Sequence, residues 1–389
     1  MIERDEFGPE KVLEVYDPGA GMHGFLVIDN TALGPGKGGI RITSSVTAEE
    51  VYRLARTMTW KNALAEIPFG GAKSGIVAEV RGLTYEAKKS LIQSFARAIR
   101  PLSPSLYIAG PDVGTGQEEM CWYAETNGSL KSCTGKPANM CVKPGEECGI
   151  PHEFGSTGFG VAYSAAEAVT FLKLNIKDTT VAIEGFGNVG TFVARHLSEL
   201  GARVVAASDR KGTIYNEQGL EVETLIKLKE KTGSVINYKP GIVLTATELL
   251  ELKVDILVPA ALSDVITPKN VDKVKAKLIV EGSNIPMTPD IEEILHKKGI
   301  LVIPDFVANA GGVISSYAEY RGYNPKRMFE MVKRKVRKNT RIVLEYARDK
   351  GMKPRDAAME IAVERVRKAM KCRLEAGVAG PRPTKLVRR

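Results

Sequence analysis

The chain contains 389 residues, of which 43% are hydrophobic and 26% are charged, as in an ordinary globular protein with room for two domains. No apolar run approaches the ~20 residues that a membrane-spanning helix needs, and the acidic N-terminus MIERDEFGPE lacks the features of a signal peptide, so we expect a cytoplasmic protein without membrane contact. The net charge of +9 arises from 55 Lys and Arg interleaved with 46 Asp and Glu, and no nucleic-acid-binding motif accompanies it, which argues against a nucleic-acid partner.

The first 130 residues mix strands and helices. A strand is predicted over residues 24–30, and a capping box opens a helix predicted over residues 47–67. A second helix is predicted over residues 84–99, and a short strand over 105–110 leads into a polar loop. Residues 131–155 are irregular and rich in Gly, Pro and Cys, which predicts a boundary between two parts of the chain.

The stretch IPFGGAKSGI surrounds Lys73 with three glycines, and GPGKGGIR places Lys37 in a similar setting. A phosphate-binding P-loop is excluded at Lys73, because that motif requires glycine where this chain has Ala72. Glycines remove side chains where a ligand or another backbone must come close. We therefore predict two glycine-flanked loops, each presenting a lysine.

Three of the five cysteines, Cys133, Cys141 and Cys148, lie within twenty residues of His152. Their spacings differ from those of ordinary zinc sites, so no metal site is predicted. The odd number of cysteines argues against a disulfide framework. The favoured interpretation is buried or loop thiols, and a metal site or a redox pair is the alternative.

Beyond residue 155 the pattern changes to alternating strands and helices. Apolar runs such as TVAIE, ARVVAAS, VDILVP, AKLIV and ILVI are separated by helical stretches, which predicts a parallel, doubly wound sheet. The chain after ANAGG is predicted to be almost wholly helical to about residue 376. The fold class is thus α/β, with helices at the C-terminus.

The stretch GFGNVG fits the dinucleotide-binding motif in its proper context, between a predicted strand and a predicted helix. GPGKGG also has the glycine spacing, but no helix is predicted after it. Asp209 ends the next strand, where an acid can accept hydrogen bonds from the adenosine ribose. Arg210 and Lys211 follow and suit a 2′-phosphate, so both NAD and NADP remain open. The cofactor residues predicted in this region are Gly185, Gly187, Asn188, Val189, Gly190, Asp209 and Arg210. His196, on the apolar side of the helix that follows, is predicted to be a packed histidine.

Three lysines from separate segments are candidates for one anion-binding site. Lys61 falls on the apolar stripe of its helix, and a lysine that faces inward needs a partner. Together with Lys37, Lys73 and the carboxylate of Asp112, it suggests proton-transfer chemistry on an anionic substrate. A set of structural salt bridges explains the same spacing equally well.

A series of motifs resolves this ambiguity. GPGKGGIRI, MTWKNA, PFGGAKSG, GPDVGTG, GSTGFG, IEGFGNVG, EGSNIPMTP and PDFVANAGGVISSY occur in the order typical of the glutamate/leucine/phenylalanine/valine dehydrogenase family, which the chain resembles over nearly its whole length. The resemblance implies a substrate-binding and oligomerisation domain at 1–150 and a Rossmann-type domain at 151–322. It also implies C-terminal helices at 323–389 that pack back toward the first domain.

The same resemblance implies roles for individual residues. Lys73 is the catalytic lysine, Asp112 shuttles protons to and from the amino group, and Lys61 holds the α-carboxylate of the substrate. Positions that line the nicotinamide or orient the substrate are Thr157, Asn188, Asn284 and Asn309. The implied ligands are an amino acid or 2-oxo acid, ammonia, and NAD or NADP, and the implied assembly is a homo-oligomer, usually a hexamer.

Substrate choice depends on fewer positions. Family members that use glutamate have a lysine where this chain has Lys37, and Ser316 aligns with a serine that assists it, although Ser315 leaves the register open. These residues favour oxidative deamination of L-glutamate to 2-oxoglutarate and its reversal. The serine in GGAKSG and the cysteine-containing insertion depart from the family pattern. A dehydrogenase of a branched-chain or other neutral amino acid, or a non-catalytic sensor of nucleotide or amino acid, are the alternatives.

Overall fold

A computed structural model describes residues 2–143 and 146–376 and divides the chain into two compact units. The first unit consists of Met1–Phe154, Val313–Met328 and Ile361–Arg389. The second consists of Gly155–Gly312 and Phe329–Glu360. Both units therefore take segments from the C-terminal helices, so the chain passes between them several times.

The first unit is built on a mixed sheet of six strands. The order is β1-β2-β5-β3-β6, with β4 paired to β5. Its strands are β1 (Lys11–Asp17), β2 (Met22–Asn30), β3 (Gly36–Lys37), β4 (Ile40–Thr43), β5 (Gly70–Val77) and β6 (Tyr107–Ile108). Its first three helices are α1 (Ala48–Leu64), α2 (Tyr85–Ile99) and α3 (Gln117–Asn127). Thr47 caps α1 by accepting a hydrogen bond from the backbone N–H of Glu50, as the capping box predicts.

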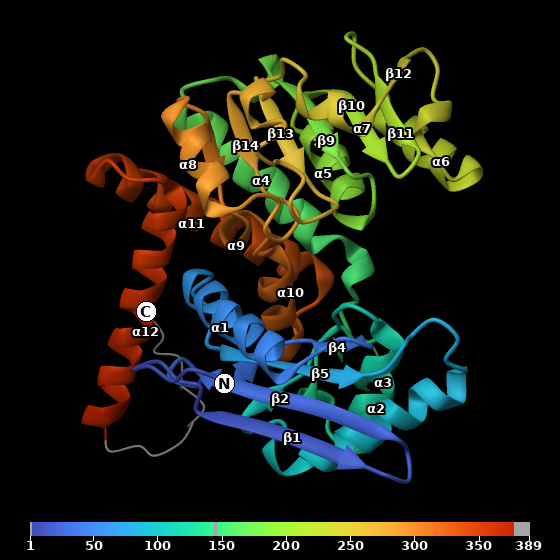
Figure 1. The fold of residues 1–389 in the computed structure, drawn as a ribbon, viewed down its shortest axis with the longest axis vertical. Helices are drawn as coiled ribbons and strands as arrows, with labels where there is room; N and C mark the ends of the chain where they lie inside the picture. Colours follow the sequence, from blue (N-terminus) through green and yellow to red (C-terminus); the bar gives the residue numbers. More distant parts are fainter. Residues whose placement is uncertain (1, 144–145, 377–389) are drawn as a thin grey trace. The chain divides into compact units, whose positions relative to one another are not determined.

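Strand β2 is buried on both faces because helices cover both (Figure 1). Phe25 and Val27 pack in a cluster with Ala55 of α1, whereas Leu26 and Ile28 join the larger core that contains Phe95 of α2. Alternate side chains of a strand point to opposite faces, which explains this division. The sheet is consequently the centre of a three-layer unit and supports the residues that lie on it.

The predicted loops around Lys37 and Lys73 are strands instead. Lys37 ends β3 and Lys73 lies in the middle of β5. The flanking glycines have a packing role, because a Cβ atom at Gly71 would lie 2.0 Å from Oγ1 of Thr59 on α1. A Cβ atom at Gly38 would lie 1.7 Å from the carbonyl oxygen of Ala72. Glycine within a strand marks such a close approach, and here it brings α1 and a neighbouring segment onto β5.

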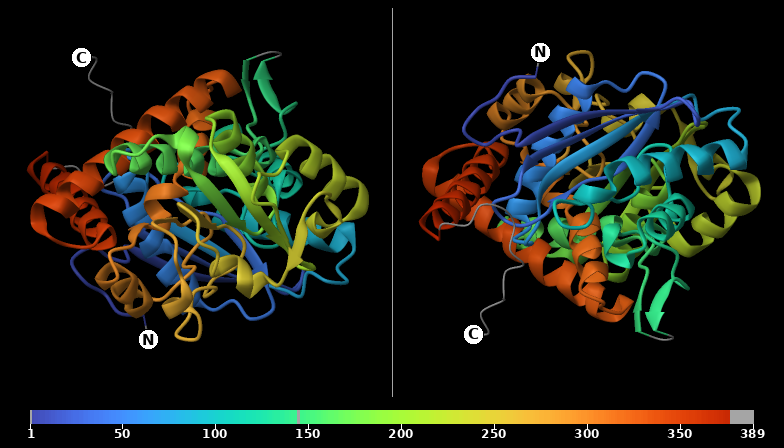
Figure 2. Two further views of the ribbon diagram at one scale, coloured as in Figure 1. Left: turned by 90° about the horizontal axis from the view of Figure 1, so that it is seen from above. Right: turned by 90° about the horizontal axis from the view of Figure 1, so that it is seen from below.

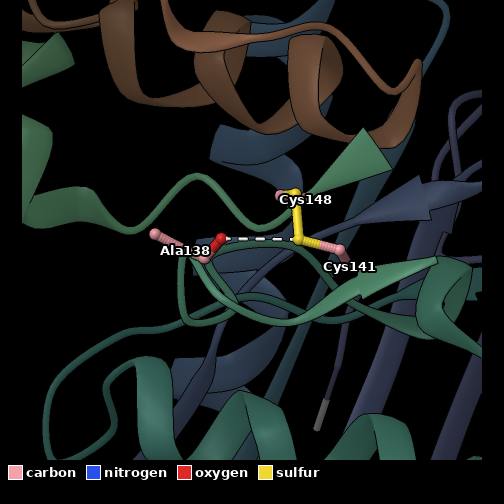
Figure 3. The surroundings of a disulfide bond; sticks show 3 residues. All are labelled: Ala138, Cys141 and Cys148. Atoms are coloured by element: carbon pink, nitrogen blue, oxygen red, sulfur yellow. Dashed lines mark hydrogen bonds between the residues drawn. A yellow bond between two sulfur atoms is a disulfide. The ribbon is translucent and has the colours of Figure 1, made fainter. Parts of the chain in front are cut away.

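The cysteine-rich insertion forms a hairpin with a disulfide, so the prediction of thiols was wrong for two of the cysteines. Strands β7 (Cys141–Lys143) and β8 (Glu146–Cys148) pair antiparallel, and they lie side by side in both views of Figure 2. Cys141 and Cys148 face each other across the pair and are joined by a disulfide (Figure 3). The sulfur of Cys141 also contacts the carbonyl oxygen of Ala138 at 3.7 Å. The pairing register of β7 and β8 places the two sulfurs together, whereas the number of cysteines in the sequence does not indicate which of them pair. Cys133 is a buried thiol, as predicted.

The second unit contains a seven-stranded sheet in the order β12-β11-β10-β9-β13-β14-β15. The strands are β9 (Thr180–Glu184), β10 (Arg203–Asp209), β11 (Gly212–Tyr215), β12 (Ile242–Leu244), β13 (Ile256–Pro259), β14 (Leu278–Val280) and β15 (Leu301–Ile303). Five strands of this sheet are parallel to one another, namely β10, β9, β13, β14 and β15. Strands β11 and β12 add antiparallel at the edge next to β10. The prediction of a Rossmann-type sheet is confirmed, with this mixed edge as a correction.

Helices complete the second unit and the C-terminus. Those in the strand-rich region are α4 (Ser156–Phe171), α5 (Asn188–Glu199), α6 (Val222–Thr232), α7 (Ala246–Leu250), α8 (Pro289–Lys297) and α9 (Asp305–Ala308). The remaining three are α10 (Gly311–Tyr320), α11 (Pro325–Lys350) and α12 (Pro354–Glu375). The end of α12 belongs to the first unit, where Arg365 donates hydrogen bonds to the carbonyl groups of Ala63 and Leu64 at the end of α1. The end of the last helix therefore packs on α1 within the first unit. No helix in the described part of the chain has the length and apolarity to cross a membrane.

Candidate active site

Lys73 is a buried lysine on the central part of β5. Its side chain is 8% exposed, and Nζ lies 3.0 Å from Oδ2 of Asp112. Burial lowers the pKa of Lys73, and the charge of Asp112 opposes that effect without cancelling it. A lysine in this state is able to accept and return a proton near neutral pH more readily than one on the surface.

Asp112 lies just beyond β6 and bonds two cations at once. Oδ2 accepts a hydrogen bond from Nε of Arg41 at 2.8 Å in addition to its contact with Lys73. Burial acts to raise the pKa of Asp112, but the charges of Lys73 and Arg41 prevail and lower it. The hydroxyl of Thr115 accepts a hydrogen bond from the backbone N–H of Asp112 and fixes the loop. The carboxylate is therefore held ionised beside the lysine.

Arg41 was not predicted as part of this group. It lies on β4 and also donates from Nη1 to Oε1 of Glu50 at 2.6 Å. The only sequence signal is its place in GGIRI, four residues after Lys37, and that spacing does not indicate a partner. The parallel pairing of β4 with β5 brings Arg41 opposite Gly75, close to Lys73.

Lys37 is more deeply buried, at 3% exposure. Its Nζ donates to the carbonyl oxygen of Ala109 at 2.7 Å, and a Cβ atom at Gly110 would lie 2.4 Å from that nitrogen. Burial lowers the pKa of Lys37 to about 7, with Cys133 and Glu319 acting in the opposite direction. A buried cation whose direct partner is a neutral carbonyl group is suited to receive an anion.

A second buried ion pair lies near Lys37 and was also missed. Nζ of Lys136 lies 2.5 Å from Oε1 of Glu319, and Oε2 of Glu319 accepts from the backbone N–H of Gly135 at 2.7 Å. Glu319 is on α10, the helix that carries Ser316. The fold thus places Lys37, Lys61, Lys73, Asp112 and Ser316 in one unit, and an ion pair joins Lys73 directly to Asp112.

The glycine motif of the second unit has the geometry that a dinucleotide requires. Gly185 has φ of +91°, and a Cβ atom at Gly190 would lie 1.8 Å from the carbonyl oxygen of Gly185. A Cβ atom at Gly187 would meet open space, and Gly187 has no side chain to cap the N-terminus of α5. Within the described residues, Oδ1 of Asn188 is buried without a hydrogen-bond partner. Free N–H groups and open space at a helix N-terminus fit a pyrophosphate.

Asp209 lies at the end of β10, as predicted, but its carboxylate already accepts three hydrogen bonds. Oδ1 accepts from the backbone N–H of Lys211 and from the hydroxyl of Ser234, and Oδ2 accepts from the backbone N–H of Val235. Arg210 and Lys211 are exposed next to it. The carboxylate has fewer positions left for ribose hydroxyl groups than an unengaged acid, so the choice between NAD and NADP remains open.

The other predicted cofactor residues gather in the second unit. Nδ2 of Asn309 donates to Oδ1 of Asn284 at 3.1 Å and to the carbonyl oxygen of Gly282 at 3.3 Å. A Cβ atom at Gly282 would lie 3.4 Å from Cγ1 of Val189. The bonded asparagines Asn284 and Asn309 are therefore next to the glycine motif. A Cβ atom at Gly312 would lie 2.9 Å from Oγ1 of Thr157.

His196 packs against Phe159 and Phe192 and contacts Glu199, in line with a packed histidine. Among residues 2–143 and 146–376, no group of three or more His, Cys, Asp or Glu side chains is arranged to hold a metal ion.

These features define the class of the protein: an α/β protein with a dinucleotide-binding motif in one unit and a group of buried lysines in the other. Residues 148–373 match the Glutamate/Leucine/Phenylalanine/Valine dehydrogenase model, and residues 9–128 match the Glu/Leu/Phe/Val dehydrogenase dimerisation domain. The chain belongs to this family of NAD(P)-dependent amino acid dehydrogenases.

Curated and structural relatives agree with this assignment. The glutamate dehydrogenase of Aeropyrum pernix is 41% identical over 362 residues, which cover 88% of this chain and 85% of that protein. The NADP-specific glutamate dehydrogenase of Saccharolobus shibatae is 38% identical over 94% of this chain and 90% of its own. The crystal structure of the hetero-hexameric glutamate dehydrogenase of Thermus thermophilus superposes with a TM-score of 0.81 at 29% identity, covering 94% of this chain and 90% of that chain.

Proposed function

We infer that the protein is an NAD(P)-dependent glutamate dehydrogenase, which converts L-glutamate and water to 2-oxoglutarate and ammonia and catalyses the reverse reaction. The observation that carries this conclusion is Lys37, a buried lysine whose Nζ bonds a neutral carbonyl group. A substrate with a second carboxylate supplies the missing counter-charge, whereas a leucine or valine side chain leaves the buried cation unpaired. Relatives named glutamate dehydrogenase support the same substrate.

Each lysine then has a separate role in the proposed mechanism. Lys37, assisted by Ser316, holds the side-chain carboxylate, and Lys61 holds the α-carboxylate. Lys73 accepts a proton from the water that attacks the imine carbon, and it stabilises the charge that develops there. Asp112 transfers protons to and from the substrate nitrogen. The short contact between Lys73 and Asp112 supports this assignment, since it allows a proton to pass between the two groups.

The second unit holds the cofactor in this proposal. Gly185, Gly187 and Gly190 let the pyrophosphate approach the N-terminus of α5, and Asn188 and Val189 lie in the same turn. Asp209 and Arg210 would bind the adenosine ribose, while Thr157, Asn284 and Asn309 would line the nicotinamide or orient the substrate. The bound nicotinamide supplies the acceptor for the hydride that leaves Cα of glutamate.

The family match also supports a proposal about the assembly. The match of residues 9–128 to a dimerisation domain supports an oligomer. We propose a homohexamer in the cytoplasm, with substrate bound mainly by residues 1–150, cofactor bound mainly by residues 151–322, and residues 323–389 returning to the first domain.

Initial rates of reductive amination test the function directly. Purified protein is supplied with ammonia, NADH or NADPH, and 2-oxoglutarate, 2-oxoisocaproate, 2-oxoisovalerate or oxaloacetate. We expect kcat/KM for 2-oxoglutarate to exceed that for the branched 2-oxo acids by at least tenfold. A preference for a branched 2-oxo acid would overturn the substrate, and binding of cofactor without any turnover would indicate a sensor.

A further inference from the structure

Arg355, in the first turn of α12, lies at the centre of a buried cluster of three acids. Its guanidinium donates to Oε2 of Glu281 at 2.6 Å, to Oε2 of Glu292 at 2.5 Å and to Oδ1 of Asp305 at 3.1 Å. The three acids are 0%, 1% and 6% exposed, respectively. One planar guanidinium thus joins the ends of β14 and β15 to helix α8, a task that its fork of donors allows.

The cluster supports a strained residue. Ile285 has φ of +50°, a backbone conformation that is costly for a β-branched side chain. Its N–H donates to Oδ2 of Asp305 at 3.1 Å, and its carbonyl oxygen accepts from the N–H of Asp264 at 3.0 Å. The Ile285 side chain is 54% exposed, so core packing does not explain the strain. Its two hydrogen bonds hold Ile285 in this conformation, and one of them is to Asp305.

Ile285 directly follows Asn284 in the chain, and Asp305 precedes Asn309, the residue that caps the end of α9. Asp305 opens α9, and the backbone N–H of Asn309 donates to the carbonyl oxygen of Asp305 at 2.8 Å. The backbone N–H of Asp305 donates in turn to Oε2 of Glu281 at 2.8 Å. Both asparagines are therefore linked to Arg355 through Asp305, Asn284 by way of Ile285 and the Asp305 carboxylate, and Asn309 by way of the Asp305 backbone carbonyl group. They also bond each other.

We propose that Arg355, Asp305 and Glu281 are positioning residues that hold the Asn284–Asn309 pair for the nicotinamide end of the cofactor. This inference rests on the proposed function, because it takes the role of the two asparagines from there. The simpler explanation is that the cluster only attaches α12 to the sheet. That explanation accounts for Glu292 on α8, but it does not require a bond from Asp305 to the backbone of a strained, exposed residue.

The test compares two ligands that share the adenosine half of the cofactor. Arg355→Lys keeps the charge but loses the fork that joins three carboxylates. We expect the dissociation constant of ADP-ribose, or of its 2′-phosphate, to change less than twofold. The dissociation constant of NADH or NADPH, measured by nucleotide fluorescence, should rise about fivefold, and kcat should fall about tenfold, because a small misplacement near the reacting atoms is costly.

A matched control is Arg341→Lys. Arg341 donates to Oε1 of Glu167, an acid of the same unit with 3% side-chain exposure, and that pair lies on α11 and α4. This variant should leave both ligands and kcat unchanged. Asp305→Asn provides a second test if Arg355→Lys fails to fold, because the amide retains an acceptor for Ile285 but loses the charge that faces Arg355.

The outcomes separate the two hypotheses. Equal weakening of ADP-ribose and of the reduced cofactor in Arg355→Lys, or no effect on either ligand or on kcat, would overturn the positioning role. If the parent protein binds the reduced cofactor but does not turn over 2-oxoglutarate, the proposed function fails, while the ratio of the two dissociation constants still decides whether Arg355 acts on the nicotinamide end.

Discussion

The cluster of charged residues around Lys37 and Lys73 in the first unit has an excess of cations, whereas the cluster around Arg355 in the second unit has an excess of acids. In the first unit, Lys37, Lys73, Arg41 and Lys136 outnumber the acids that contact them. In the second unit, Arg355 faces three carboxylates. Burial lowers the pKa of Lys37 to about 7 and raises the pKa of Glu281 to about 8, so one member of each cluster has a pKa close to neutral pH.

The two clusters differ in how their surplus charge is neutralised. A dicarboxylate substrate is able to neutralise the cations of the first unit, which makes their charge useful for binding. In the second unit, burial raises the pKa of Glu281 and of Glu292, and Oε1 of both is buried without a hydrogen-bond partner in the described residues. A surplus of buried charge therefore indicates a ligand site in one unit and a support in the other, and the connections of each group decide which.

The largest effect is expected for Lys73→Met. Loss of the group that moves protons should lower kcat for 2-oxoglutarate by about 10²- to 10⁴-fold, while binding of ADP-ribose stays unchanged. Lys11→Met, at an exposed lysine of the same sheet, serves as the control and should match the parent. A decrease in kcat of less than tenfold would remove Lys73 from the catalytic role.

Lys37→Leu should change the substrate rather than the reaction. The variant loses a charged hydrogen bond to the distal carboxylate, so kcat/KM for 2-oxoglutarate should fall roughly 10- to 150-fold. Activity with 2-oxoisocaproate should be retained or increase, because the apolar side chain removes the buried charge. Equal losses with both substrates would show that Lys37 has a structural role instead.

The affinity for dicarboxylates should depend on pH through Lys37. Below pH 7 the lysine of the free protein is charged, and the dissociation constant of glutarate should vary little. Above pH 7 binding must first add a proton to Lys37, so affinity should fall up to about tenfold per pH unit. Calorimetry in buffers of different ionisation enthalpy should show proton uptake at pH 8 for glutarate. Butyrate, which lacks the second carboxylate, should show less uptake, and identical values for both would contradict this assignment.

Glu281→Gln should change how stability depends on pH, with a difference between parent and variant that grows from pH 5 to pH 8. Because the pKa of Glu281 is raised in the folded protein, folding retains a proton that the unfolded chain releases, and stability is lost as the pH rises toward 8. The free energy of unfolding of the parent, relative to that of the variant, should decrease by about 1 kcal/mol per pH unit between pH 5 and 8. Urea unfolding at three pH values measures this, and parallel curves would show that Glu281 is ionised throughout.

Local sequence patterns predicted much of both units. GFGNVG was placed correctly between β9 and α5, because that motif depends on a turn of a few residues. The capping box at Thr47 predicted the start of α1 for the same reason. The residue pattern grouped Lys73 and Asp112 as candidates for one site but explained them equally well as structural salt bridges, and only the resemblance decided between the two. Arg41, Glu319 and Arg355 were missed, because an isolated charged residue gives no indication of burial.

What the sequence determined by itself is the class of fold, the dinucleotide motif and the identity of the groups able to carry charge at the site. The tertiary structure decided that Lys37 and Lys73 lie in strands, that Cys141 pairs with Cys148, and that Arg355 collects three acids. The physical reason is that capping, turns and periodicity act over a few neighbouring residues, whereas burial and ion pairing depend on segments that meet only when the sheets form.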